Sequence, residues 1–229
     1  MTNPFRLVWD RFIKGKSAAW QAISAVIMAV VTIMLYRVGS DTNELSRATQ
    51  KALISFAGIG AGPVLTSPDR KARVAQEFLF NWTNSGTTQA RNAVTAISGD
   101  TWPSELPKGF DFPDLPGNQP QSIAIGPRDT TGVRIDIPTN KLIPTWEGKA
   151  HLYVWGWVVY DDVFRTDTHL TEFCIEVIQI APIGPGKTGA DLSDPNTPFS
   201  WNIQKCKDHN CYDDDCKDYS ARIKQSRTQ

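Results

Sequence analysis

The most uniform hydrophobic segment of the chain is a run of twenty residues, Ser17 to Tyr36, that contains no charged side chain. A helix of about twenty apolar residues is long enough to cross a bilayer core of roughly 30 Å. Trp20 and Tyr36 lie near the two ends of the run, where amphipathic aromatic rings favour the headgroup region. We therefore predict a transmembrane helix at residues 17–36.

Two other interpretations fit an apolar run near an N-terminus. One is a buried helix of a soluble protein. The other is a cleaved signal peptide, with the small residues Val38 and Ser40 before the cleavage site. The run is longer than the roughly 7–15 apolar residues of a usual signal peptide, and a long leader precedes it. An uncleaved, single-pass signal-anchor is therefore the preferred interpretation.

The segments on either side of the apolar run are also predicted to be helical. Residues 1–16 form a basic amphipathic leader that suits the headgroup plane of a membrane or, alternatively, a cytoplasmic partner. Its apolar positions follow helical spacing: Phe5, Val8, Trp9, Phe12 and Ile13. After the run, the pair Gly39 and Ser40 is predicted to break the helix, and Asp41 to cap a separate stalk helix over residues 37–53.

From residue 54 the apolar pattern changes to the alternation of strands. In the segment 72–82, Val74, Phe78, Phe80 and Trp82 are predicted to point to one face. The turn at 84–86 contains Asn and Gly, which tolerate positive φ. We predict that residues 89–98 return from this turn as the second strand of a hairpin.

The strongest strand pattern covers residues 150–180. Its first strand is apolar on both faces, so it is predicted to be central and covered on both sides. In the second strand Phe173 and Ile175 should face the core, whereas Glu172, Cys174 and Glu176 share the other face. The segment 101–120, with five prolines, is predicted to be a surface loop that packs its aromatic side chains on the domain.

These patterns predict a mainly β fold. Roughly seven short antiparallel strands separated by turn signals favour an immunoglobulin-like β-sandwich over residues 54–181. Residues 182–229 are predicted to be a Gly/Pro-rich linker and a cysteine-rich tail.

The charges are unevenly distributed although the net charge is zero. Residues 1–16 carry a balance of +3, whereas residues 38–229 hold 19 basic and 23 acidic residues. This distribution does not predict the basic patch that is typical of nucleic-acid-binding domains. The basic leader predicts a cytoplasmic N-terminus. The C-terminal domain is then expected outside the cytoplasm, where disulfides persist.

The tail carries the residues of greatest chemical interest. Cys206, His209, Cys211 and Cys216 lie within eleven residues, and such a set can bind zinc. Their spacing is not the paired C-x-x-C arrangement of zinc ribbons, and disulfides are the simpler interpretation in an oxidising compartment. With Cys174 there are four cysteines, which allow three connectivities. A bond from Cys174 would strap the tail across the sheet; free thiols are expected if the domain is cytoplasmic.

Part of the chain resembles a known group of proteins. The segments 81–92 and 153–174, with the proline-rich segment between them, are similar to bacterial single-pass membrane proteins that have a C-terminal β-sandwich and no established activity. The most specific pattern is Tyr160, Asp162, Phe164, His169, Thr171, Phe173 and Cys174. The resemblance implies a bacterial inner-membrane location with a periplasmic domain, and it implies a fold without a mechanism.

No set of residues predicts catalysis or a cofactor. His151 and His169 have acidic residues nearby in sequence, but a histidine bonded to a cross-strand carboxylate is the simpler interpretation of each. We predict a non-enzymatic module that interacts with another envelope protein. The alternative is a metal- or redox-responsive domain that uses the tail. The predicted partners also include the lipid bilayer, and small-residue pairs in the apolar run favour a homo-oligomer.

Overall fold

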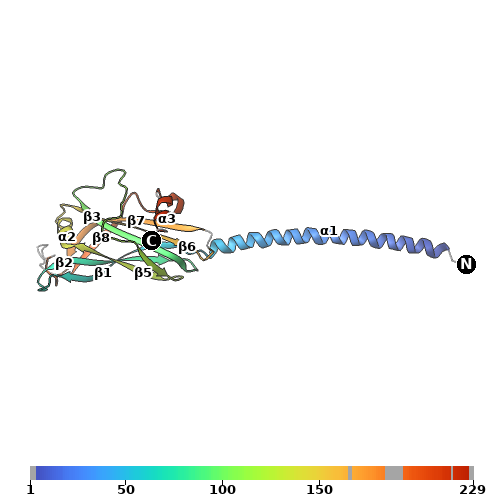
Figure 1. Cartoon of the computed structure of the whole chain (residues 1–229), viewed down its shortest axis with the longest axis horizontal. Coiled ribbons are helices and arrows are strands. Elements are labelled where there is room, and N and C mark those ends of the chain that lie inside the picture. Colours follow the sequence, from blue (N-terminus) through green and yellow to red (C-terminus); the bar gives the residue numbers. More distant parts are fainter. Residues whose placement is uncertain (1–3, 165–166, 184–192, 218, 227–229) are drawn as a thin grey trace. The chain divides into compact units, whose positions relative to one another are not determined.

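The computed structural model describes residues 4–164, 167–183, 193–217 and 219–226. The chain forms two compact units, a helical unit at Met1–Thr49 and a β unit at Gln50–Gln229. The helical unit contains α1 (Pro4–Thr49), and all the strands lie in the β unit (Figure 1).

Helix α1 runs without a break through the positions predicted to interrupt it, so the separate stalk helix at 37–53 is wrong. A glycine inside a helix costs only about 1 kcal/mol relative to alanine. The hydroxyls beside Gly39 also stay bonded within the helix, because Ser40 Oγ donates to the Arg37 carbonyl at 2.8 Å and Thr42 Oγ1 to the Val38 carbonyl at 2.6 Å. The helix therefore continues through Gly39 and Ser40.

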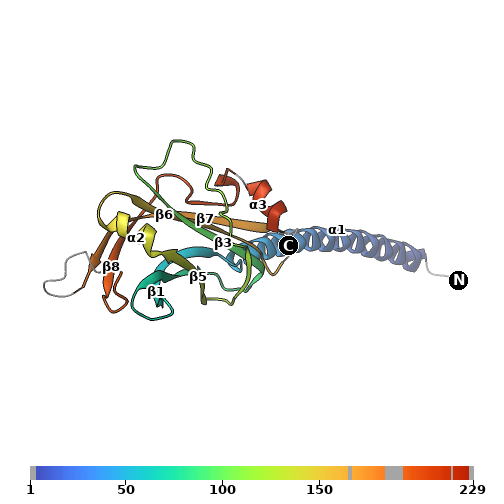
Figure 2. The ribbon, with the colours of Figure 1, turned by 60° about the vertical axis from the view of Figure 1, so that its left-hand side comes forward.

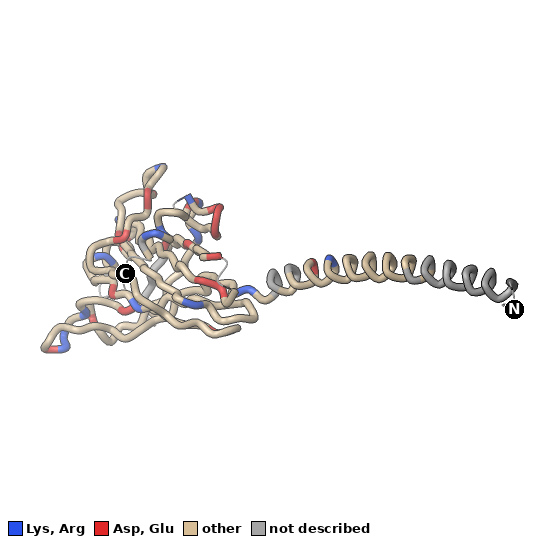
Figure 3. The backbone as a smooth tube through the Cα atoms, turned by 45° about the vertical axis from the view of Figure 1, so that its right-hand side comes forward, with Lys and Arg blue, Asp and Glu red and all other residues tan. Residues whose placement is uncertain are grey.

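Among the described residues, the segment Ala22–Asn43 of α1 is long and apolar enough to cross a membrane. It overlaps the predicted span 17–36 and extends beyond it. The apolar side chains of this segment are exposed, for example Met28 at 66% and Leu35 at 67%. Figure 3 shows a stretch of α1 without Lys, Arg, Asp or Glu next to its grey N-terminal part. A helix that is apolar around its whole circumference requires an apolar environment.

The β unit consists of two antiparallel sheets, which confirms the predicted β-sandwich. The smaller sheet has the order β1-β2-β5, with strands at Ile54–Thr66, Arg73–Asn84 and Thr130–Pro138. The larger sheet has the order β4-β3-β6-β7-β8, with strands at Gln121–Ile125, Ala90–Trp102, His151–Asp161, Thr168–Pro182 and Phe199–Lys205. The short strand β9 (Cys211–Tyr212) also pairs with β7.

Strands β6 and β7 form the predicted central hairpin. The alternation along β6 is confirmed, because one set of side chains enters the core between the sheets and the other set is buried on the outer face. Phe173 of β7 lies in the inner core, 4.1 Å from the Phe56 ring centroid and parallel to it. Opposite Phe173 stands Gly156, where a Cβ atom would come within 2.8 Å of the phenylalanine ring.

The hairpin predicted for residues 72–98 is wrong. Strand β2 pairs with β1 and β5, whereas β3 pairs with β4 and β6 in the opposite sheet. The segment after β2 crosses between the sheets because the Asn84 side chain anchors it. Its Oδ1 accepts from the Leu53 amide at 3.0 Å, and its Nδ2 donates to the Gly126 carbonyl at 2.9 Å.

The predicted inward position of Val74 is also wrong, since this side chain is 54% exposed. Leu65 pairs with Ala75 and Thr66 with Arg73, so Val74 is an extra residue without a partner in the ladder. Such a bulge shifts the alternation of the strand by one residue. Phe78, Phe80 and Trp82 follow the bulge and are buried as predicted.

The sandwich extends beyond the predicted boundary at residue 181, because β8 and β9 of the supposed linker and tail join the larger sheet. Two helices of the β unit, α2 (Thr139–Trp146) and α3 (Tyr219–Ser226), and the short 3-10 turn η2 (Asp213–Asp215) complete it. The immunoglobulin-like form stays a prediction. After β3 and β4 in the larger sheet, β5 returns to lie beside β2 in the smaller sheet.

The outer face of the larger sheet is covered by two segments. Figure 2 shows the proline-rich loop (green) and α3 (red) on the side of this sheet that faces away from β1 and β5. Phe110 and Phe112 of the loop contact the ring of Trp155, whose Nε1 donates to the Pro113 carbonyl at 2.9 Å. The predicted packing of this loop on the domain is therefore confirmed.

Candidate functional site

The tail crosses the outer face of β7 and is attached there by a disulfide between Cys174 and Cys206. The Cys206 amide also donates to the Cys174 carbonyl at 3.0 Å. Asn210 repeats this pairing with its side chain, because Nδ2 donates to the Cys174 carbonyl at 3.2 Å and Oδ1 accepts from the Cys174 amide at 3.3 Å. Of the connectivities left open by the sequence, the structure has one in which a bond from Cys174 straps the tail across the sheet.

The second disulfide joins Cys211 and Cys216 across the 3-10 turn η2. All four cysteines are paired, so the connectivity is Cys174 with Cys206 and Cys211 with Cys216. Next to this turn, Asp213 Oδ1 accepts from the Leu170 amide at 2.9 Å, and Asp213 Oδ2 lies 2.9 Å from His169 Nδ1. These bonds continue the β9 pairing along β7.

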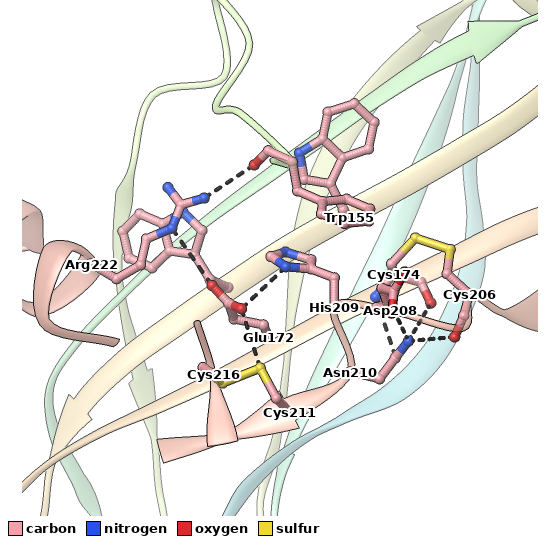
Figure 4. A network of polar contacts seen from close by, with 12 residues as sticks. Trp155, Glu172, Cys174, Cys206, Asp208, His209, Asn210, Cys211, Cys216 and Arg222 are labelled. Carbon is pink, nitrogen blue, oxygen red and sulfur yellow. Dashed lines mark hydrogen bonds and ion pairs between the residues drawn. A yellow bond between two sulfur atoms is a disulfide. The ribbon is translucent and has the colours of Figure 1, made fainter. Parts of the chain in front are cut away.

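Between the two disulfides lies a buried charged cluster, formed by Glu172 of β7, His209 of the tail and Arg222 of α3 (Figure 4). Glu172 Oε2 lies 3.1 Å from His209 Nδ1, and the two side chains are 3% and 7% exposed. Arg222 Nε lies 3.7 Å from Glu172 Oε1. Cys211 Sγ is 3.2 Å from Glu172 Oε2; a disulfide sulfur carries no hydrogen, so this is a close contact.

The proline-rich loop completes the surroundings of this cluster. Arg222 Nη1 lies 2.8 Å from Asp114 Oδ2, and Arg222 Nη2 donates to the Phe112 carbonyl at 3.1 Å. The other oxygen of Asp114 accepts from Trp157 Nε1 at 2.9 Å. The His209 ring stacks on Phe112, with centroids 4.2 Å apart and planes within 7°. The cluster thus joins the loop, β7, the tail and α3.

The His169–Asp213 pair has shifted ionisation. The hydrogen bond to Asp213 raises the pKa of His169 above its usual value, although burial opposes the shift. For Asp213, burial raises the pKa, but the hydrogen bonds from His169 and from the Leu170 amide outweigh it, so the pKa lies below its usual value. Both shifts favour the charged pair, which attaches the tail to the start of β7.

The third histidine has a structural partner as well. His151 Nδ1 of β6 lies 2.6 Å from Glu176 Oε1 of β7, and Gln204 Nε2 donates to Glu176 Oε2 at 2.8 Å. This contact is the bond between a histidine and a cross-strand carboxylate that the sequence predicts. His151 and His169 lie on different strands, and each contacts its own carboxylate.

The structure divides the predicted zinc set of Cys206, His209, Cys211 and Cys216. Cys206 belongs to the Cys174 disulfide, and the other three residues lie around Glu172. One oxygen of Glu172 and the sulfurs of Cys211 and Cys216 lie within 4.8 Å of one another. Thiolates are the metal-binding form of cysteine, so these sulfurs are not ligands while they are bonded to each other.

Sequence reasoning missed Glu172 and Arg222 as members of this site. Glu172 was placed on the same strand face as Cys174, so a strap from Cys174 to the tail already implied that the tail passes over Glu172. Arg222 had no comparable signal, because its position depends on how the chain turns after Cys216.

Comparison of the chain with protein-family models, with curated proteins and with solved structures gives no match.

Proposed function

We propose that this chain is a single-pass, membrane-anchored envelope protein whose β-sandwich lies outside the cytoplasm and acts as a protein-interaction module. In the form suggested by the sequence resemblance, it is a bacterial inner-membrane protein with a periplasmic domain. The observation that carries the proposal is the combination of an apolar helix, Ala22–Asn43, with two disulfides in the β unit. Disulfides persist in exported domains and are rare in the cytosol.

The histidines and the buried charged cluster support an interaction module over an enzyme. Each of the three histidines contacts a carboxylate that holds strands or tail together. The charged cluster is buried beneath the tail, whereas a catalytic site needs a group that a substrate can reach. The arrangement provides a rigid outer layer of loop and tail, which suits recognition of another envelope protein.

The location is tested by treating spheroplasts that express the full chain with a membrane-impermeant maleimide. We expect labelling of the cysteines only after reduction, and without permeabilisation. Labelling that needs permeabilisation but no reductant would contradict both the exported domain and its disulfides.

The interaction is tested by photo-crosslinking in cells. A photoreactive amino acid is placed at Lys108 of the proline-rich loop or at Arg134 of β5, two exposed positions. The loop covers the larger sheet, and Arg134 lies in the smaller one. We expect a discrete adduct from at least one position, and the difference between them locates the contact. Absence of adducts from both positions would contradict the proposal.

A further inference from the structure

The cluster beneath the tail contains a nearly complete set of ligands for a soft divalent cation. We propose that reduction of the Cys211–Cys216 disulfide creates a zinc site formed by Glu172, His209, Cys211 and Cys216. This inference goes beyond the interaction module and does not depend on it.

Two of the six ligand separations already fit a tetrahedral zinc centre. With Zn–N and Zn–O distances of about 2.0 Å, a nitrogen and an oxygen ligand lie about 3.3 Å apart, and an oxygen and a sulfur ligand about 3.5 Å apart. His209 Nδ1 and Cys211 Sγ lie 3.1 and 3.2 Å from Glu172 Oε2. One carboxylate oxygen is thus positioned beside both a nitrogen and a sulfur.

Two other separations have to change. The ligand atoms within 4.8 Å of one another come from Glu172, Cys211 and Cys216, so the His209 ring has to move toward the sulfurs. Two thiolates on one zinc ion lie about 3.8 Å apart, compared with about 2.05 Å in a disulfide. The Cα atoms of Cys211 and Cys216 are 5.2 Å apart, so rotation about the Cα–Cβ bonds can open the sulfurs without moving the backbone. The Cys211 sulfur remains beside Glu172, because β9 pairing holds Cys211 opposite it.

Burial and charge also favour a cation. Glu172 is 4% exposed, and its Oε1 accepts no hydrogen bond from the described residues. Two thiolates and one carboxylate carry three negative charges, so zinc leaves a single negative charge on the site. Arg222, whose Nε lies 3.7 Å from Glu172 Oε1, provides a positive charge that the site shares with Asp114. A buried site of this kind needs such compensation.

The proposed reaction requires a dithiol as reductant. The dithiol transfers two electrons and two protons, the Cys211–Cys216 bond breaks to give two thiols, and the dithiol becomes a disulfide. Zinc then binds and displaces the two thiol protons to the solvent. The disulfide closes across only 5 residues, compared with 32 for Cys174–Cys206. A shorter loop contributes less stability to its disulfide, which favours reduction of this bond first.

The test uses the full chain in detergent micelles, oxidised or reduced, titrated with Zn²⁺ or with Co²⁺ as a spectroscopic probe. We expect one ion per reduced chain, with a sulfur-to-cobalt charge-transfer band, and no binding to the oxidised chain. Glu172→Gln and His209→Ala should each weaken zinc binding at least about tenfold. The matched control, Cys174→Ala with Cys206→Ala, keeps all four ligands and should bind zinc like the reduced wild type.

A second measurement avoids variants that fail to fold. The reduced wild-type chain is alkylated with and without zinc, and the modified cysteines are mapped by mass spectrometry. We expect zinc to protect Cys211 and Cys216 and to leave the extent of alkylation at Cys174 and Cys206 unchanged. Equal protection of all four cysteines, zinc binding to the oxidised chain, or binding that survives Glu172→Gln unchanged would each overturn the proposal, as would the absence of binding.

Discussion

The inner face of the larger sheet packs mainly through apolar side chains against β2 and β5, whereas its outer face is covered by a loop and a tail held by disulfides and charged pairs. Burial of apolar surface is nearly independent of pH and of redox conditions. The contribution of ion pairs to stability depends on pH, and that of disulfides depends on redox conditions. The inner face of this sheet therefore contributes a nearly constant amount to the stability of the fold, whereas the contribution of the outer face changes with pH and redox conditions.

The largest effect is expected from a cavity in the inner face. Phe173 is 2% exposed and contacts the rings of Phe56, Phe80 and Trp82. Phe173→Ala should lower the free energy of unfolding by about 3–5 kcal/mol, as measured by urea denaturation of the full chain with tryptophan fluorescence. The loss should be the same with and without reductant. A loss below about 1 kcal/mol would show that Phe173 is not part of the inner core.

The two disulfides of the outer face should differ in their contributions. The Cys174–Cys206 bond closes a segment of 32 residues and the Cys211–Cys216 bond one of 5. Replacing Cys174 and Cys206 by alanine should therefore lower the free energy of unfolding by about 4 kcal/mol, and replacing Cys211 and Cys216 by about 2 kcal/mol. The reason is that a disulfide that closes a longer loop restricts the unfolded chain more. Urea denaturation under oxidising conditions measures both values. The reverse order would contradict the pairing described above.

The His169–Asp213 pair, which attaches the tail to the start of β7, predicts that the stability of the fold depends on pH. The pKa of His169 is raised, so its contribution is complete below the unfolded value of about 6.5 and is lost as the pH rises through the folded value. The pKa of Asp213 is lowered, so its contribution is lost as the pH falls below about 3.8. The pair therefore stabilises the fold most between these limits.

His169→Gln removes the charge and keeps a hydrogen-bond donor, which makes it the suitable variant for this test. Because Asp213 is 44% exposed, we expect a loss of only about 0.5–1 kcal/mol at pH 5.5, and a smaller one at pH 8.5. Urea denaturation at the two pH values measures the difference. An equal loss at both would mean that the charge of His169 contributes nothing.

The smallest effect is expected at the bulge of β2. Val74→Thr should change the free energy of unfolding by less than about 0.5 kcal/mol, because the side chain is exposed. Its buried counterpart is Val133 of β5, which is 3% exposed, and Val133→Ala should cost about 2 kcal/mol. Thermal unfolding of both variants checks the register of the smaller sheet. Similar losses would place Val74 in the core.

The sequence predicted the elements whose pattern is local. The alternation in residues 150–180 identified the central hairpin and both faces of β6, and the uncharged run identified the apolar part of α1. Sequence reasoning placed the strand at 89–98 beside the wrong neighbour, because a turn of Asn and Gly does not reveal that Asn84 bonds to Leu53 and Gly126, which are distant in sequence. It misplaced Val74, because a bulge depends on the partner strand.

For the candidate site, the sequence predicted the residue types and the face of Glu172, and it indicated that a bond from Cys174 would strap the tail across that face. It left three disulfide connectivities open, because the spacing of cysteines does not specify which sulfurs meet. It also grouped Cys206 with the zinc candidates, since nearness along the chain was the available criterion. In the structure Cys206 is bonded to Cys174, and the residue beside Cys211 is Glu172, because β9 pairing places these two residues opposite each other.

The sequence by itself determined the apolar helix, the strand-rich domain and the chemical character of the tail, because periodicity and composition are properties of neighbouring residues. The tertiary structure decided which sheet each strand joins, which cysteines pair, and that Glu172, His209 and Arg222 form one buried cluster. These outcomes depend mainly on contacts between segments that are at least 13 residues apart in sequence. Such long-range contacts are selected by the packing of the whole domain rather than by the local pattern.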